Sequence, residues 1–118
     1  MYNREQVNKA SLEYFNGDEL AANVFTTKYA LKDSNGSYTE LTPNDMHSRL
    51  AKEFARIEMK YGGESALTEQ QIYSYIKDFK YIVPQGSPMF GIGNSFVNAS
   101  LSNCVVVASP DEIILFCA

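Results

Sequence analysis

The pattern of apolar and polar residues is helical along most of residues 1–83. The clearest stretch follows Thr42, where apolar side chains recur every three or four residues and therefore share one face of a helix. This set consists of Met46, Leu50, Phe54, Ile57 and Tyr61. Thr42 is a favourable N-cap residue, and Gly62 with Gly63 is typical of a helix end. We predict a long amphipathic helix whose apolar stripe faces the core, with His47 at the surface.

Two shorter helical patterns precede this helix. The first covers about residues 5–15, and Asn16 with Gly17 interrupts it. Asp18 is placed to cap a second helix that runs to about Lys28. Its apolar side, which we expect to be buried, consists of Leu20, Val24 and Phe25.

Two further signals flank the long helix. Residues 33–37, with the sequence DSNGS, form a strong turn signal that fits a small hairpin and a longer loop equally well. Residues 68–71 match a capping box, in which the side chains of Thr68 and Gln71 satisfy each other's backbone amides. The helix predicted after this box has an apolar face made of Ile72, Tyr75, Ile76 and Phe79.

The helical spacing stops before the C-terminal part of the chain. Residues 105–108 and 113–117 are continuous apolar runs, which are typical of buried strands, and residues 109–111 predict a turn between them. A sheet of one or two strands is only marginally stable by itself. We therefore expect a mainly α fold that leads into the first one or two strands of a sheet whose remainder is missing.

Composition excludes several classes of function. The net charge is −4, and the ten basic residues form no stripe of the kind that binds nucleic acid. No apolar run approaches the ~20 residues of a membrane span, and the N-terminus lacks the apolar core of a signal peptide, so we expect a cytoplasmic protein without membrane contact. With only two cysteines and one histidine, the chain offers neither a disulfide framework nor a structural zinc site.

The candidate chemistry is concentrated in residues 84–107. Cys104 stands where a loop meets a predicted strand, but no Lys, Arg or His follows Lys80 to lower the pKa of its thiol. From the residues alone, Cys104 is best interpreted as a small buried hydrophobic side chain. Ser87 and Asn103 are equally typical of turns that satisfy local backbone groups. The GIG sequence at residues 91–93 lacks the further residues of a phosphate-binding loop.

Two motifs nevertheless resemble a known family. The sequence PQGSPMFGIGN at residues 84–94, followed by SLSNCVVV at residues 100–107, resembles the N-terminal part of the catalytic subunit of ribonucleotide reductases. The resemblance is greatest to the adenosylcobalamin-dependent class II branch. It extends back through KYAL at residues 28–31 and ELTPNDM at residues 40–46, and covers roughly residues 24–110.

The resemblance implies roles for three residues. Cys104 matches a redox-active cysteine that reduces the ribose and forms a disulfide with a second cysteine far downstream, a position that Cys117 does not match. Ser87 and Asn103 match residues that bind the substrate. The implied partners are the remainder of the catalytic subunit, a ribonucleoside di- or triphosphate and a thioredoxin-like thiol reductant. The implied cofactor, adenosylcobalamin, is bound outside this chain, and none is bound by this segment.

We therefore expect a helical N-terminal region at residues 1–83, and a substrate loop with the start of an α/β barrel at residues 84–118. The barrel is otherwise missing, so the chain would be an N-terminal fragment or split part of a reductase, inactive alone. A class I, di-metal-dependent reductase is the nearest alternative within the family. Two alternatives lie outside this family. The chain would then be a small non-enzymatic helical protein that binds a partner through its apolar C-terminal strand, or a product that aggregates through that strand.

Overall fold

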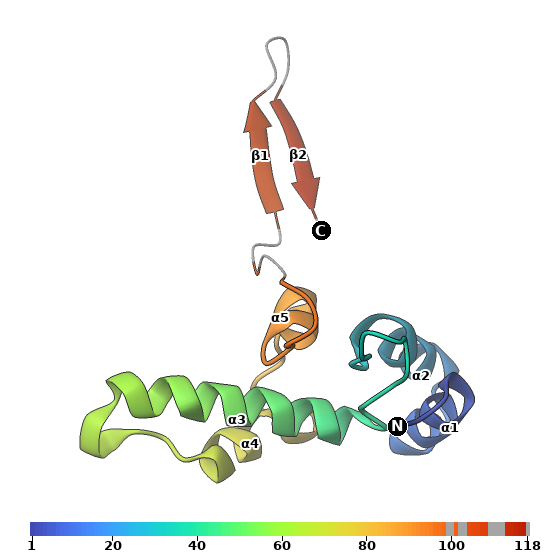
Figure 1. Ribbon diagram of the computed structural model, residues 1–118, viewed down its shortest axis with the longest axis horizontal. Coiled ribbons are helices and arrows are strands. Elements are labelled where there is room, and N and C mark those ends of the chain that lie inside the picture. The colour runs from blue at the N-terminus through green and yellow to red at the C-terminus, as the bar shows by residue number, and fades with distance from the viewer. Residues whose placement is uncertain (99–100, 102–103, 109–112, 118) are drawn as a thin grey trace.

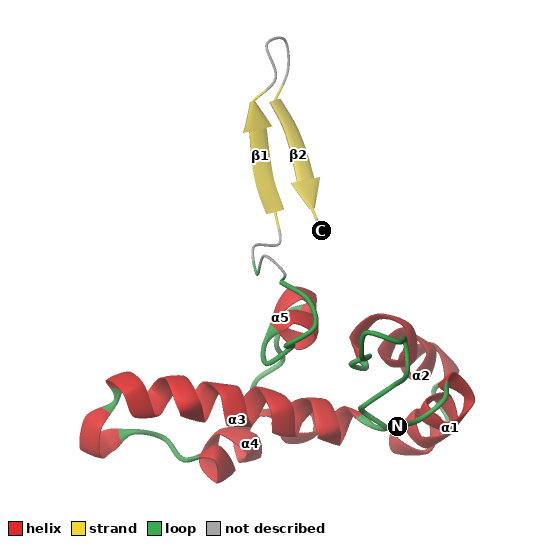
Figure 2. Ribbon diagram, in the orientation of Figure 1, coloured by secondary structure: helices red, strands yellow, loops and turns green. Residues whose placement is uncertain are grey.

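The computed structural model describes residues 1–98, 101, 104–108 and 113–117, and these are mainly helical. The α-helices are α1 (Arg4–Tyr14), α2 (Glu19–Val24), α3 (Pro43–Tyr61), α4 (Glu69–Ile76) and α5 (Gly86–Gly91). Three short segments of other helical type are η1 (Phe25–Tyr29), η2 (Gly63–Ser65) and η3 (Lys77–Phe79). The strands are β1 (Cys104–Ala108) and β2 (Ile113–Cys117). Figure 1 shows a helical body from which the two strands project, and Figure 2 marks the helices, strands and loops.

The first two helices begin and end close to the predicted residues. Asn16 and Gly17 have φ angles of 54° and 90°, which reverse the chain after α1. The carboxylate of Asp18 then accepts a hydrogen bond from the Ala21 amide at 2.9 Å and caps α2. Helical structure continues through η1, so Phe25 is buried, as predicted. The prediction for Leu20 was wrong, because its side chain points to solvent in the first turn of α2 and is 74% exposed.

The two helices after residue 42 also match their sequence signals. The Asp45 carboxylate accepts hydrogen bonds from the amides of Leu41 and Thr42 at 2.8 and 3.0 Å, which satisfies donors at the start of α3. The capping box of α4 is present, since Thr68 Oγ1 accepts from the Gln71 amide and Gln71 Oε1 accepts from the Thr68 amide. Helix α3 packs on α4 and η3, and this packing forms the centre of the helical body.

The predicted apolar stripe of α3 divides into two halves. Met46 and Leu50 are completely buried, whereas Phe54, Ile57 and Tyr61 are 36, 40 and 75% exposed, so the prediction that the whole stripe faces the core was wrong. The cause is a difference in length, since α3 has 19 residues and α4 only eight. At a rise of ~1.5 Å per residue, α4 covers less than half of α3. The second half of the stripe therefore lies at the surface.

The turn at residues 33–37 closes as a tight loop. The Asp33 carboxylate accepts hydrogen bonds from the amides of Asn35 and Ser37, both at 2.9 Å. Single antiparallel bridges join Tyr38 to Lys32 and to Tyr2. The sequence left a hairpin and a longer loop open, and the structure has a loop closed by these bridges, which fixes the N-terminus beside it.

The two predicted strands form an antiparallel pair. The register places Cys104 opposite Cys117, and Ala108 opposite Ile113. The turn predicted at residues 109–111 lies outside the described residues. Within the described part of the chain, no helix combines the length and the apolar character that crossing a membrane requires.

Candidate functional site

The segment that the sequence singled out, residues 84–94, contains the short helix α5 (Gly86–Gly91) where a loop was expected. The Met89 amide donates to the Gln85 carbonyl and the Ile92 amide to the Pro88 carbonyl, both at 3.1 Å. Pro88 fits because it stands in the first turn of α5, where its missing N–H would have had no intrahelical partner. Ser87, which the sequence alone assigns to a turn, therefore lies inside a helix.

Two glycines allow this helix to approach its neighbours. A Cβ atom on Gly86 would lie 3.2 Å from the hydroxyl of Tyr29 in η1. A Cβ atom on Gly93 would lie 2.9 Å from the Arg49 side chain, and Gly93 also has a φ angle of +70°. A larger residue at either position would require the contacted side chain, Tyr29 or Arg49, to shift.

A charged network that the sequence did not indicate lies beneath α5. Arg49 of α3 donates hydrogen bonds to the carbonyl oxygens of Ile92 and Met89, the latter at 2.8 Å. Its Nε atom lies 2.6 Å from Glu40 Oε1, and Glu40 Oε2 accepts from the Leu31 amide at 2.9 Å. The two charged side chains are only 10 and 6% exposed. Glu40 belongs to the ELTPNDM motif, but no local rule of sequence pairs it with Arg49.

The predicted site residues are only partly described. Ser87 lies in the first turn of α5 and is partly buried. Cys104 is the first residue of β1, and its partner in the antiparallel register is Cys117. Asn103 lies outside the described residues. Figure 1 shows the two strands projecting beyond α5, away from the helical body.

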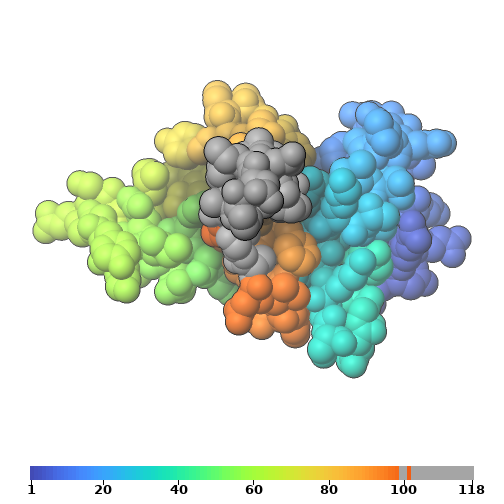
Figure 3. Space-filling view, turned by 90° about the horizontal axis from the view of Figure 1, so that it is seen from above, coloured from blue at the N-terminus to red at the C-terminus, as the bar shows by residue number. Residues whose placement is uncertain are grey.

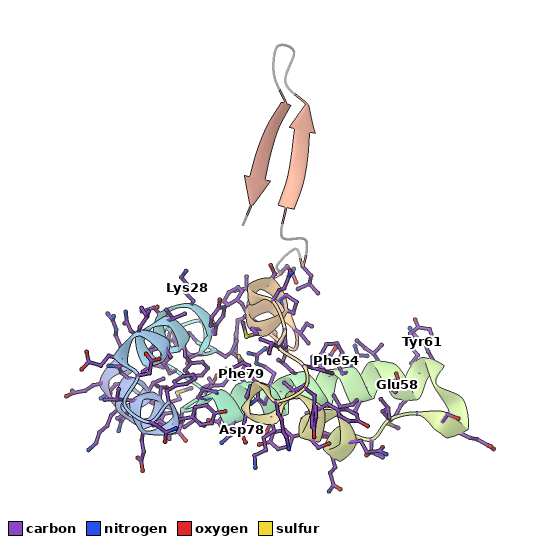
Figure 4. The ribbon with its side chains drawn as sticks, turned by 180° about the vertical axis from the view of Figure 1, so that it is seen from behind. Lys28, Phe54, Glu58, Tyr61, Asp78 and Phe79 are labelled. Atoms are coloured by element: carbon purple, nitrogen blue, oxygen red, sulfur yellow. The ribbon has the colours of Figure 1, made fainter. Side chains whose placement is uncertain are left out.

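An apolar groove opens beside α5. It has a volume of about 550 Å³ and lies between the second half of α3 and the end of α5. Its apolar lining includes Phe54, Ile57, Ile92 and Leu101. Figure 4 shows Phe54 and Tyr61 along α3, and Figure 3 shows residues 86–98, in orange, exposed on the face seen from above.

Two titratable side chains, His47 and Tyr14, have pKa values shifted by their packing in the helical body. His47 is completely buried, so the prediction of a surface position was wrong: the ring of Phe79 packs edge-on against it, with ring centroids 4.7 Å apart. Burial lowers the pKa of His47, and the Asp78 charge opposes this effect. Burial and a 2.9 Å hydrogen bond to Asp78 raise the pKa of Tyr14. No three His, Cys, Asp or Glu side chains among the described residues are grouped closely enough to hold a metal ion.

Together these features define a mainly helical domain that holds a short, close-packed helix beside an apolar groove. Residues 15–110 match the family model of the ribonucleotide reductase all-alpha domain. Because this match covers most of the chain, the protein belongs to that family. No curated protein and no solved structure matches the chain significantly.

Proposed function

We propose that this chain is the all-α domain of a ribonucleotide reductase catalytic subunit and helps to convert ribonucleotides to deoxyribonucleotides. The observation that carries the proposal is the family match over residues 15–110, which includes both the segment with Ser87 and the motif with Cys104. The domain acts together with the remainder of the catalytic subunit, since the radical chemistry needs residues that these motifs do not contain.

In this proposal Cys104 supplies reducing equivalents. Two cysteine thiols are oxidised to a disulfide, and their two electrons and two protons replace the 2′-hydroxyl of the ribose by hydrogen and release it as water. A thioredoxin-like dithiol then reduces the disulfide by thiol–disulfide exchange. Ser87 and Asn103 hold the ribonucleotide in place. Adenosylcobalamin, bound outside this chain, is the proposed source of the radical.

The groove between α3 and α5 supports the proposed partner. Phe54 and Ile57 continue a buried stripe but are left more than a third exposed. Exposed apolar surface that adjoins a core is typical of an interface. The remainder of the catalytic subunit covers this groove in the assembled enzyme.

The test is the replacement of Cys104 by Ser in the chain co-expressed with the remainder of the subunit. Loss of the thiol removes one half of the redox pair, so we expect multiple-turnover nucleotide reduction to fall by roughly three orders of magnitude. Cys117→Ser is the matched control, because the sequence motif assigns the second thiol to a downstream cysteine.

Three results are informative. Loss of activity in Cys104→Ser alone supports the proposal as stated. Equal loss in Cys117→Ser would move the redox partner to the residue that faces Cys104 in the hairpin. Full multiple-turnover activity in Cys104→Ser would contradict the redox role.

The non-enzymatic alternative retains one supporting observation. The sheet has the order β1-β2, so each strand has one edge without a neighbour among the described residues. Such edges can pair with a strand of another chain. A partner that binds the wild type but not a variant with Ile114→Pro, and no nucleotide reduction in the co-expressed complex, would favour this alternative.

A further inference from the structure

We propose that Arg49 is a positioning residue that fixes α5, and with it Ser87, at the substrate side of the domain. The part of this inference that concerns substrate rests on the proposed function. The part that concerns α5 rests only on the hydrogen bonds, burial and charges of the helical body.

The first step is the need of α5 for external acceptor partners. The last carbonyl groups of any α-helix have no intrahelical donors. In α5, which has only six residues, these groups are a large share of the backbone. Arg49 donates to one of them, the carbonyl oxygen of Met89, and to the carbonyl oxygen of Ile92, the residue that caps the end of α5. A single side chain of α3 therefore fixes the end of α5.

The second step is the orientation of Arg49 itself. Its Nε–H binds Glu40 Oε1, while the other oxygen of Glu40 accepts from the Leu31 amide. Glu40 thereby holds the guanidinium in one plane and connects it to the loop that precedes α3. Because Glu40 is buried and Arg49 is only 10% exposed, removal of either side chain leaves a charge without its partner, which is strongly destabilising locally.

The third step is the other end of α5. Gly86 lies against the ring of Tyr29. A side chain at this position would contact the Tyr29 hydroxyl closely enough to displace it. Tyr29 is in turn placed by η1, whose end is closed by a hydrogen bond from the Ala30 amide to the Phe25 carbonyl at 2.9 Å. Helix α5 is thus held at both ends, and Ser87 lies next to Gly86 within this clamp.

Hydrogen exchange of the 118-residue chain tests the clamp. In Arg49→Met, we expect the amides of Met89 and Ile92 to lose about tenfold of their protection, since a charge-assisted contact is removed. The matched control is Arg56→Met on the same helix, which breaks an exposed ion pair with Glu53; the hydrogen bonds described for Arg56 go to Glu53 and not to α5. We expect less than about twofold change there.

Nucleotide reduction in the co-expressed subunit tests the consequence for substrate. We expect Arg49→Met to raise the KM for the ribonucleotide about tenfold with little change in kcat, because the chemistry remains and the binding geometry is lost. Arg49→Lys keeps the positive charge but lacks the several N–H donors of the guanidinium, so we expect a KM between those of the wild type and Arg49→Met. Ser87→Ala shows independently whether the residue carried by α5 contributes to KM.

The inference about α5 and the inference about substrate binding can be contradicted independently. Unchanged exchange of α5 in a folded Arg49→Met or Glu40→Gln variant would overturn the inference whatever the protein does. Loosening of α5 without a change in KM in either Arg49→Met or Ser87→Ala would overturn the role of this segment in substrate binding. If Arg49→Met does not fold, Arg49→Lys provides the same comparison at a smaller amplitude.

Discussion

His47 illustrates how a single side chain can depart from its sequence context. It follows Met46 in α3 and is completely buried, and neither ring nitrogen has a hydrogen-bond partner among the residues that the structure describes. The ring instead packs against Phe79, which η3 brings to α3 in a left-handed conformation with a φ angle of 54°. The adjacent Asp78 has a similar angle and binds the Tyr14 hydroxyl. A strained two-residue segment thus joins α1 and α3.

This arrangement predicts a loss of stability in weak acid. Because burial holds the pKa of His47 below its ordinary value of 6.5, the unfolded chain takes up a proton first as the pH falls. The free energy of unfolding should therefore decrease as the pH falls through about 6.5, and level off only below the folded pKa. We expect the melting temperature to drop by roughly 4 °C between pH 7.5 and pH 5.5.

The variant His47→Leu provides the control. His47 is the single histidine of the sequence, so no other imidazole titrates in this range. Leucine is apolar and of similar size, and it should give a melting temperature that is nearly flat over the same pH interval. Parallel curves for the wild type and His47→Leu would show that the pH dependence comes from other groups.

At the scale of elements, α3 is divided into a buried and an exposed half. Leu50 is completely buried, whereas Phe54, one turn later on the same face, is 36% exposed. In the isolated chain, Leu50→Ala should cost about 3 kcal/mol of unfolding free energy through the cavity it leaves. Phe54→Ala should cost only about 1 kcal/mol, although phenylalanine is the larger side chain.

Urea denaturation monitored by circular dichroism measures both values. A larger loss for Phe54→Ala than for Leu50→Ala would mean that the second half of α3 is buried in solution. It would also show that the groove beside α5 is closed in the free chain.

At the scale of the whole molecule, the hairpin projects from the same side of the helical body as α5 (Figure 1), and the apolar groove lies between α5 and the second half of α3. Ile57→Glu places a charge in the groove, where a half-exposed side chain tolerates it in the free chain. We expect this variant to keep its melting temperature but to lose about tenfold in affinity for the co-expressed remainder of the subunit, because the charge would be desolvated there.

Met59→Glu is the matched control for this experiment. Met59 belongs to the same helix and is 77% exposed, but it does not line the groove. Co-purification should be unaffected by this change. Equal weakening by both variants would indicate a general effect of charge on α3 rather than an interface at the groove.

Much of the fold could be predicted from local signals. Helix ends depend on neighbouring backbone groups, so they are encoded within a few residues. Examples are the cap at Asp18, the capping box of Thr68 and Gln71, and the end of α3 at Gly62. The family resemblance also follows from the sequence, because each of its two motifs, at residues 84–94 and 100–107, is a short unbroken stretch. For the site, the sequence indicated the segment with Ser87 and the position of Cys104.

The tertiary structure decided what depends on distant parts of the chain. The pairing of Arg49 with Glu40 and the α5 carbonyls joins residues up to 43 positions apart, and no local rule selects that pair. The exposure of Phe54 and the burial of His47 depend on how far α4 and η3 reach along α3. Local hydrogen bonds and periodicity are written in short stretches of sequence, whereas burial depends on which elements meet in space.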